Sequence, residues 1–164
     1  MIKNIGVEKK RVAPKGMTTS DLCYAAAEKL IDELGWEKKE IEALVFVTQS
    51  GDYIIPASAA ILQDRLGLPH NCMALDINLG CSGYVYGLSM LGGLMSASKM
   101  KKALLLVGDL SAVTSSYRDK STYPLFGDSG TVTALEYQEN APDIPFNLQT
   151  DGSGHQAIMI PDGG

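Results

Sequence analysis

The sequence has 164 residues, of which 45% are hydrophobic, with a formal net charge of −5 and an isoelectric point near 5.0. This length and composition favour one domain with its own core, and the acidic balance argues against nucleic-acid binding, which requires clustered Lys and Arg. The three cysteines, Cys23, Cys72 and Cys81, are odd in number and lack metal-type spacing, so neither a disulfide framework nor a metal site is predicted. We therefore expect a reduced, cytoplasmic protein.

The first predicted helix follows a polar, basic start that lacks the apolar core of a signal peptide. Thr18 and Asp21 supply the chemistry of a helix N-cap, and Gly35 is a typical C-terminal stop. Between them, apolar residues recur at helical spacing, at Leu22, Ala25, Ala26, Leu30 and Leu34. Cys23 lies beside these positions, and we expect it to contribute to packing.

The apolar run at 43–49 predicts a buried strand, and the run at 103–108 predicts a strand that is covered on both faces. A third, mostly apolar run at 72–77 also has strand character. Helical patterns at 57–66 and from Cys81 to about residue 98 separate them. This alternation predicts an α/β fold with a mainly parallel sheet and flanking helices.

Residues 77–98 carry no formal charge, and a stretch of this length could span a bilayer. The stretch contains five glycines and four serines, however, which favours a central helix buried on all sides within a water-soluble core. We therefore expect no membrane association.

Gly80 and Cys81 follow a predicted strand and open this uncharged helix, an arrangement that presents a nucleophile at a sharp turn. The free N–H groups of a helix N-terminus lower the pKa of a thiol and can hold an oxyanion. Gly83 and Gly87 would lie on one helix face, where another backbone or an acyl chain could approach. The alternative is that Cys81 is a small buried hydrophobe.

The last part of the chain contains a glycine-rich turn at 125–130 that leads into a predicted strand at 131–137. No phosphate-binding lysine motif is present and no helix follows, so we interpret this turn as structural. Short strands are predicted at 146–150 and 156–160, and His155 between them is expected to be a solvent-exposed loop residue.

Residues 76–88 (DINLGCSGYVYGL) resemble the active-site segment of 3-oxoacyl-[acyl-carrier-protein] synthase III. Elements at 5–11, 125–130 and 151–154 are similar to other motifs of this family. The resemblance implies a thiolase-like fold, in which this chain is one half of a layered αβαβα arrangement with a buried central helix. It implies that residues 1–164 are the N-terminal half, truncated at both ends, and that the family's catalytic His and Asn lie in a second half.

On this resemblance, Cys81 is the nucleophile that takes an acyl group from acyl-CoA and passes it to malonyl-acyl carrier protein. The activity implied is the decarboxylative Claisen condensation of fatty-acid biosynthesis, with acyl-CoA as substrate and no further cofactor. Lys120 matches an arginine that clamps the adenine of coenzyme A, although Lys stacks less well than Arg. Asn4 stands where the family usually has another arginine.

The resemblance also implies a homodimer, in which Ile55 before Pro56 reaches into the acyl pocket of the partner subunit. The alternative is that Ile55 is an apolar residue stapling the next helix. We expect the dimer to form through a sheet edge near 103–108 and the Ile55 loop.

Two other functions stay open. One is a related thiolase-fold condensing enzyme, such as a hydroxymethylglutaryl-CoA synthase or an enzyme of a specialised acyl or polyketide pathway. The other is a non-catalytic half that acts only as a scaffold. We expect the isolated chain to be inactive in condensation, because its 164 residues lack the matching His and Asn.

Overall fold

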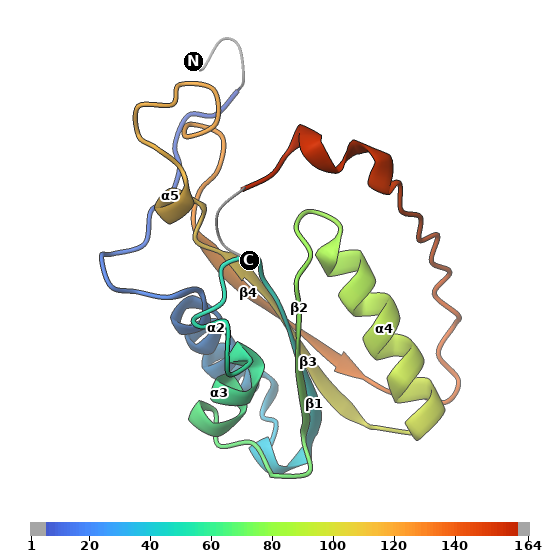
Figure 1. Ribbon diagram of the computed structural model, residues 1–164. Coiled ribbons are helices and arrows are strands. Elements are labelled where there is room, and N and C mark those ends of the chain that lie inside the picture. The colour runs from blue at the N-terminus through green and yellow to red at the C-terminus, as the bar shows by residue number, and fades with distance from the viewer. Residues whose placement is uncertain (1–5, 161–164) are drawn as a thin grey trace.

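Four strands form one sheet in the computed structural model, which describes residues 6–160 (Figure 1). They are β1 (Ile41–Val47), β2 (Met73–Ile77), β3 (Lys102–Asp109) and β4 (Ser129–Glu136), in the order β2-β1-β3-β4. β2, β1 and β3 are parallel, whereas β4 runs antiparallel to β3. The prediction of an α/β fold with a mainly parallel sheet is therefore confirmed.

The two central strands are buried on both faces, because successive side chains of a strand point to opposite sides. In β1, Leu44 and Phe46 pack on one side of the sheet, and Val45 and Val47 pack on the other. β3 divides in the same way, with Leu104 and Leu106 facing one side and Ala103 and Leu105 the other. Cover on both faces explains why these segments are apolar without alternation.

The central position of β3 corrects one expectation. Residues 103–108 were predicted to form an edge of the sheet at a dimer interface. Instead, Leu105 lies opposite Val45 of β1 and Thr133 of β4, so β3 has a neighbour on each side. The sequence could not reveal this, because an interior strand and an apolar edge strand have the same composition. The outer strands of the sheet are β2 and β4.

Helices cover the sheet unequally. α2 (Thr19–Leu34) and α3 (Ser58–Arg65) lie on one face, and α4 (Gly83–Ser98) lies on the other (Figure 1). Shorter elements are η1 (Lys38–Glu40), α5 (Ser111–Thr114) and η2 (Gly152–Ala157). Among residues 6–160, every helix is too short or too polar to traverse a lipid bilayer.

The ends of α2 follow the predicted chemistry. The hydroxyl of Thr18 accepts a hydrogen bond from the N–H of Asp21, and the Asp21 carboxylate accepts one from the N–H of Thr18 at 2.9 Å. These two bonds satisfy donors that the helix itself leaves free. Gly35 ends the helix in the left-handed region, with φ 63°.

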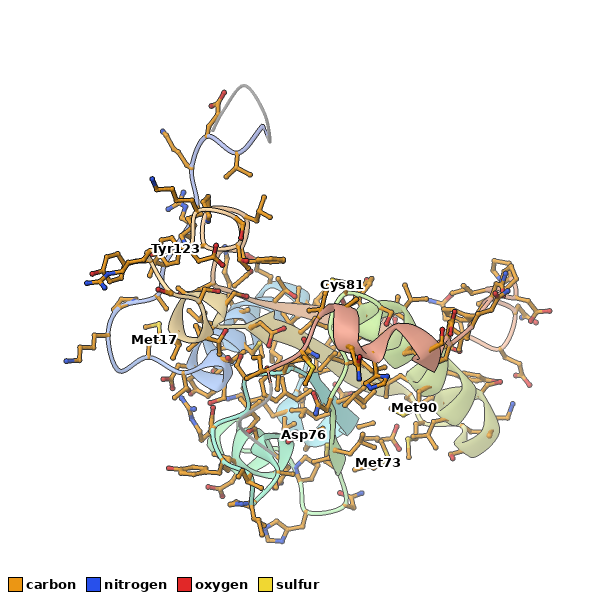
Figure 2. The ribbon with its side chains drawn as sticks, turned by 45° about the horizontal axis from the view of Figure 1, so that its top comes forward. Met17, Met73, Asp76, Cys81, Met90 and Tyr123 are labelled. Carbon is orange, nitrogen blue, oxygen red and sulfur yellow. The ribbon has the colours of Figure 1, made fainter. Side chains whose placement is uncertain are left out.

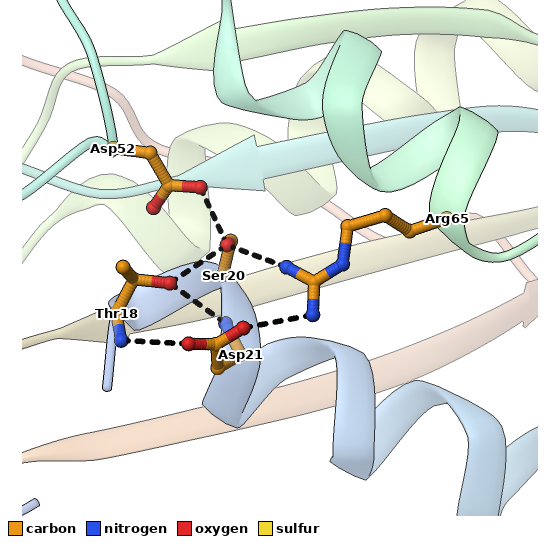
Figure 3. Close-up of polar contacts among 5 residues, drawn as sticks. All are labelled: Thr18, Ser20, Asp21, Asp52 and Arg65. Atoms are coloured by element: carbon orange, nitrogen blue, oxygen red, sulfur yellow. Dashed lines mark hydrogen bonds and ion pairs between the residues drawn. The ribbon is translucent and has the colours of Figure 1, made fainter. Parts of the chain in front are cut away.

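A polar cluster joins α2 to α3 and to the loop after β1 (Figure 3). Arg65 of α3 donates to the Ser20 hydroxyl at 3.1 Å and pairs with the Asp21 carboxylate at 2.8 Å. Ser20 in turn donates to Asp52 at 2.6 Å. Arg65 also lies over the ring of Tyr24, 4.8 Å from its centroid, so the two helices are fixed to each other at the sheet surface.

α2 also contacts β4, which comes much later in the chain. Gly130 of β4 leaves no room for a side chain, since an added Cβ would lie 2.5 Å from the Cβ of Leu22 and 2.6 Å from the backbone nitrogen of Cys23. The strand can therefore approach the helix backbone closely because residue 130 is glycine.

The predicted strands at 146–150 and 156–160 are wrong. Residues 141–151 have no regular structure, and η2 occupies most of the following stretch. This segment crosses the outer side of α4, where the Tyr86 hydroxyl donates to the carbonyl of Gln149 at 3.1 Å (Figure 1). A strand needs a neighbouring strand to satisfy its backbone groups, and the helix surface offers none.

Candidate active site

Cys81 lies in the turn that joins β2 to α4, beyond the carboxyl end of β2 and well away from Met73 at its start (Figure 2). The turn is closed by a hydrogen bond from the N–H of Gly83 to the carbonyl of Gly80 at 2.8 Å. Ser82 is the N-cap and α4 begins at Gly83, two residues later than predicted. Cys81 therefore precedes the helix, and its side chain is exposed rather than packed in the core.

The other two cysteines have the opposite environment. Cys23 of α2 and Cys72 before β2 are buried in the core beneath α2 and α3. Burial raises the pKa of the Cys23 thiol to about 12 and that of the Cys72 thiol to about 11, because the thiolate loses hydration there. Cys81 is thus the cysteine whose thiol a reagent or substrate can reach.

Two glycines seat α4 on the sheet directly beneath this turn. An added Cβ at Gly83 would lie 2.4 Å from the Cγ1 of Val47, and one at Gly87 would lie 2.7 Å from the Cδ1 of Leu105. The close approach at these glycines is made by side chains, chiefly of β1 and β3, and not by the backbone or acyl chain that the sequence analysis expected. Its effect is to hold the start of α4, and with it Cys81, against the carboxyl ends of the parallel strands.

α4 is buried along one stripe only. Gly83, Gly87, Leu91 and Met95 are buried at four-residue spacing, whereas Tyr84 and Val85 are exposed. Burial on all sides, predicted from the uncharged sequence, is therefore incomplete within residues 6–160. The exposed side of the helix begins next to Cys81.

Carboxylates organise the loops around the turn, a role that the sequence analysis missed. Asp76 of β2 accepts hydrogen bonds from the N–H groups of Ser58 and Ala59, both at 2.7 Å, and so binds the N-terminus of α3. Asp109 accepts from the Gln49 N–H at 2.7 Å and from the Ser50 hydroxyl at 3.0 Å. In the sequence, this role is indicated only by an acidic residue at or near the end of an apolar strand.

Two surface hollows lie at the carboxyl ends of the parallel strands, and Gln49 and Ser50 line both of them. The larger, of about 510 Å³, is lined by the loop at 48–54 together with Asp76 and Asn78. The smaller, of about 100 Å³, lies between Gln49, Ser50 and the stretch 109–114. Among residues 6–160, no three or more His, Cys, Asp and Glu side chains are gathered as they would be in a metal site.

The other predicted site residues lie in exposed loops. Ile55 is 84% exposed, as part of an apolar projection with Tyr53 and Ile54. Lys120 is exposed in the segment after α5. Among residues 6–160, no hydrogen bond or ion pair links Cys81, Ile55 and Lys120 to one another.

The glycine-rich turn at 125–130 has the structural role that was predicted. The Asp128 carboxylate accepts hydrogen bonds from the N–H of Ala13 and from that of Ala112, both at 2.8 Å. The turn thereby fixes an N-terminal segment beside α5. Asn4, predicted to stand in place of a family arginine, lies outside the described residues, as does Ile5 of the motif at 5–11.

Comparison with known proteins gives a consistent match. Residues 75–152 fit the family model of 3-oxoacyl-[acyl-carrier-protein (ACP)] synthase III. The chain is 33% identical over 165 residues to a beta-ketoacyl-[acyl-carrier-protein] synthase III from Syntrophomonas wolfei, covering 100% of this chain and 49% of the relative. The corresponding protein from Chlamydia caviae is 35% identical over 166 residues, with the same coverage.

The structural match agrees with the sequence matches. A crystal structure of 3-oxoacyl-(acyl-carrier protein) synthase from Burkholderia xenovorans superposes with a TM-score of 0.91 and 42% identity. That superposition covers 99% of this chain and 47% of the other, so the thiolase-like fold class predicted from the sequence is confirmed. The chain spans about half the length of the curated relatives it matches.

Proposed function

Because the chain belongs to the 3-oxoacyl-[acyl-carrier-protein] synthase III family, we propose that it is the half of a condensing enzyme that carries the acyl-accepting thiol. The observation that supports this most is the contrast among the cysteines: Cys81 is exposed at the turn before α4, and Cys23 and Cys72 are buried. Residues 1–164 would then form the N-terminal half, as the order of the family's motifs suggests.

The proposed first step is acyl transfer. The sulfur of Cys81 attacks the carbonyl carbon of an acyl-CoA, and the thiol of coenzyme A leaves with the proton that the cysteine gives up. Negative charge would develop on the carbonyl oxygen before coenzyme A leaves, and the positive end of the α4 dipole, which follows Cys81 directly, would stabilise it. Transfer to malonyl-acyl carrier protein would follow, with loss of carbon dioxide.

Condensation requires more than acyl transfer. The carbanion or enolate formed as carbon dioxide leaves must be stabilised, and the family resemblance assigns this to a His and an Asn of a second half. His155 is an exposed residue of η2, and its Nδ1 lies 3.3 Å from the carbonyl of Gly152. We therefore propose that residues 1–164 alone accept an acyl group but do not condense it.

The same proposal assigns roles to the exposed loops. Lys120 would contact coenzyme A, and Ile55 would reach the acyl pocket of a partner subunit in a cytoplasmic homodimer. The supporting observation is the apolar projection formed by Tyr53, Ile54 and Ile55, whose exposed fractions are 65%, 92% and 84%. Ile55→Asp should shift the protein towards the monomer in light scattering, and an unchanged dimer mass would contradict this role for Ile55.

The test of the function combines labelling with acyl transfer. Brief alkylation of the folded protein near neutral pH, followed by peptide mapping, should modify Cys81 well before Cys23 or Cys72. In a separate sample that has not been alkylated, incubation with acetyl-CoA should add one acetyl group to Cys81. A scaffold without catalytic function would be alkylated but not acetylated. Robust 3-oxoacyl product from the 164 residues alone would show that the catalytic groups have been assigned wrongly.

A further inference from the structure

Gln49 occupies a fixed position between the two surface hollows. Its N–H donates to Asp109 at 2.7 Å, and its neighbours Thr48 and Ser50 donate from their hydroxyls to the same carboxylate oxygen at 3.1 and 3.0 Å. The N–H of Thr48 also donates to the carbonyl of Ile77 at the end of β2. The backbone at residue 49 is therefore held from both neighbouring strands.

The side chain of Gln49 reaches the turn that carries Cys81. A Cβ added at Gly80 would lie 2.8 Å from the Gln49 Oε1, 3.3 Å from Cδ and 3.5 Å from Nε2, so the carboxamide lies directly against the residue before the nucleophile. Gly80 is not among the described glycines with positive φ. A side chain at residue 80 would therefore displace the flexible end of Gln49, whereas the backbone conformation of Gly80 does not itself call for glycine.

The carboxamide of Gln49 is also available for a ligand. The residue is exposed and borders both hollows, and within residues 6–160 no hydrogen bond is formed by its Oε1 or Nε2. A neutral carboxamide provides two N–H donors and needs no change of protonation to use them. Such a group is suited to an oxygen on which negative charge develops.

We propose that Gln49 contacts the substrate and donates an Nε2–H hydrogen bond to the carbonyl oxygen of the acyl group transferred to Cys81. The inference rests on the proposed function. As the Cys81 sulfur forms its bond to the carbonyl carbon, the bond from that carbon to the sulfur of coenzyme A breaks, and the thiol proton of Cys81 passes to coenzyme A. Gln49 stabilises the oxyanion between these two events and is not itself consumed.

The experiment separates the carbonyl contact from the reactivity of the thiol. Gln49→Leu keeps the approximate size of the side chain and removes the donor. We expect the rate of Cys81 acetylation by acetyl-CoA to fall by about a hundredfold in the intact polypeptide that carries this chain. The rate of modification by methyl methanethiosulfonate, which has no carbonyl group, should change by less than about twofold.

A second variant tests the geometry. Gly80→Ala places a methyl group where the carboxamide lies, so it should also slow acetylation. If it acts by displacing Gln49, the double variant should be no slower than Gln49→Leu alone. Gln138→Leu, another exposed glutamine, is the matched control and should acetylate normally.

Each outcome decides the proposal. A fall of less than about fivefold in Gln49→Leu would overturn it, as would an equal fall with both reagents, because the latter shows damage to the turn itself. Unchanged thermal unfolding midpoints exclude misfolding as the cause. If the unaltered protein is not acetylated at all, the proposed function fails and the role of Gln49 fails with it. Acetylation that is insensitive to residue 49 overturns this inference alone.

Discussion

The two faces of the sheet are built differently. On one face, α2 and α3 cover the larger core cluster, which includes Phe46, Leu104 and Leu106, and Arg65 joins the two helices. On the other face, α4 alone rests on a smaller cluster around Val45 and Leu105, with its outer side exposed. Cys23 and Cys72 belong to the closed face, and Cys81 lies at the margin of the open one.

This difference separates the part of the fold that supports the loops from the part that exposes the Cys81 thiol. The closed face places the ends of β1 and β3 rigidly, and the groups at those ends, such as Asp109, fix the loop beside Cys81. On the open face the Cys81 thiol is exposed, as the proposed acyl transfer requires. Changes on the open face should therefore affect reactivity most, and changes on the closed face should affect stability.

The largest expected effect is on the open face. Cys81→Ala in the intact polypeptide should reduce acyl transfer by on the order of a thousandfold or more, because Cys81 is the proposed nucleophile and the other two cysteines within residues 6–160 are buried. Transfer of radiolabelled acetyl from acetyl-CoA measures it. Cys72→Ala is the control from the closed face and should leave transfer intact. Comparable labelling of the Cys81→Ala protein would remove the contrast between the faces.

The second prediction compares two glycines on opposite sides of α4. Gly83→Ala should destabilise the protein by about 1–3 kcal/mol, because its Cβ would overlap Val47. A Cβ added at Gly92 would meet no other atom within 4 Å. Gly92→Ala should instead raise the free energy of unfolding by about 0.5–1 kcal/mol, because alanine has a higher helix propensity than glycine. Urea unfolding of the two variants gives both values. Equal effects would mean that α4 is not seated on the sheet as described.

The third prediction concerns the start of α2 on the closed face. Thr18→Ala removes the acceptor for the N–H of Asp21 and should cost about 1 kcal/mol of stability. Thr18→Ser retains a hydroxyl and should cost clearly less. Thermal unfolding of the two variants side by side provides the measurement, and a loss as large for Ser as for Ala would exclude the cap as the cause.

The smallest expected effect is the pH dependence of the same cap. A hydrogen bond from the Thr18 N–H, with further help from Arg65, lowers the pKa of Asp21 below its usual value of 3.8. A lowered pKa stabilises the folded state above the ordinary pKa, and this contribution is lost as the pH falls through the pKa of the folded state. Since the pair is partly exposed, we expect less than about 1 kcal/mol. Asp21→Asn should flatten the dependence of the urea midpoint below about pH 4.

Much of the fold could be predicted from the sequence, because its signals are local. The N-cap at Thr18 and the stop at Gly35 predicted α2, and short, mostly apolar runs predicted the three parallel strands. The prediction of strands at 146–150 and 156–160 was wrong, because a strand depends on a neighbouring strand that the local sequence does not show. The central position of β3 was missed for the same reason.

The candidate site divides in the same way. Cys81 was found because a glycine and a cysteine between a strand and a helix form a local pattern. Gln49 was not found, because its contact with Gly80 joins two segments that are distant in sequence. Asp109 was missed too, since its hydrogen bonds to the loop after β1 depend on the pairing of β3 with β1.

The close contact between Gly130 and α2 has a consequence for folding during synthesis. The helix leaves the ribosome early, but the strand that packs on its backbone near Leu22 and Cys23 is made only after most of the chain. Until then, the part of α2 near Leu22 and Cys23 and the edge of β3 that pairs with β4 lack these partners. Such distant contacts raise the contact order and slow folding, so we expect the nascent chain to depend on chaperones until β4 emerges.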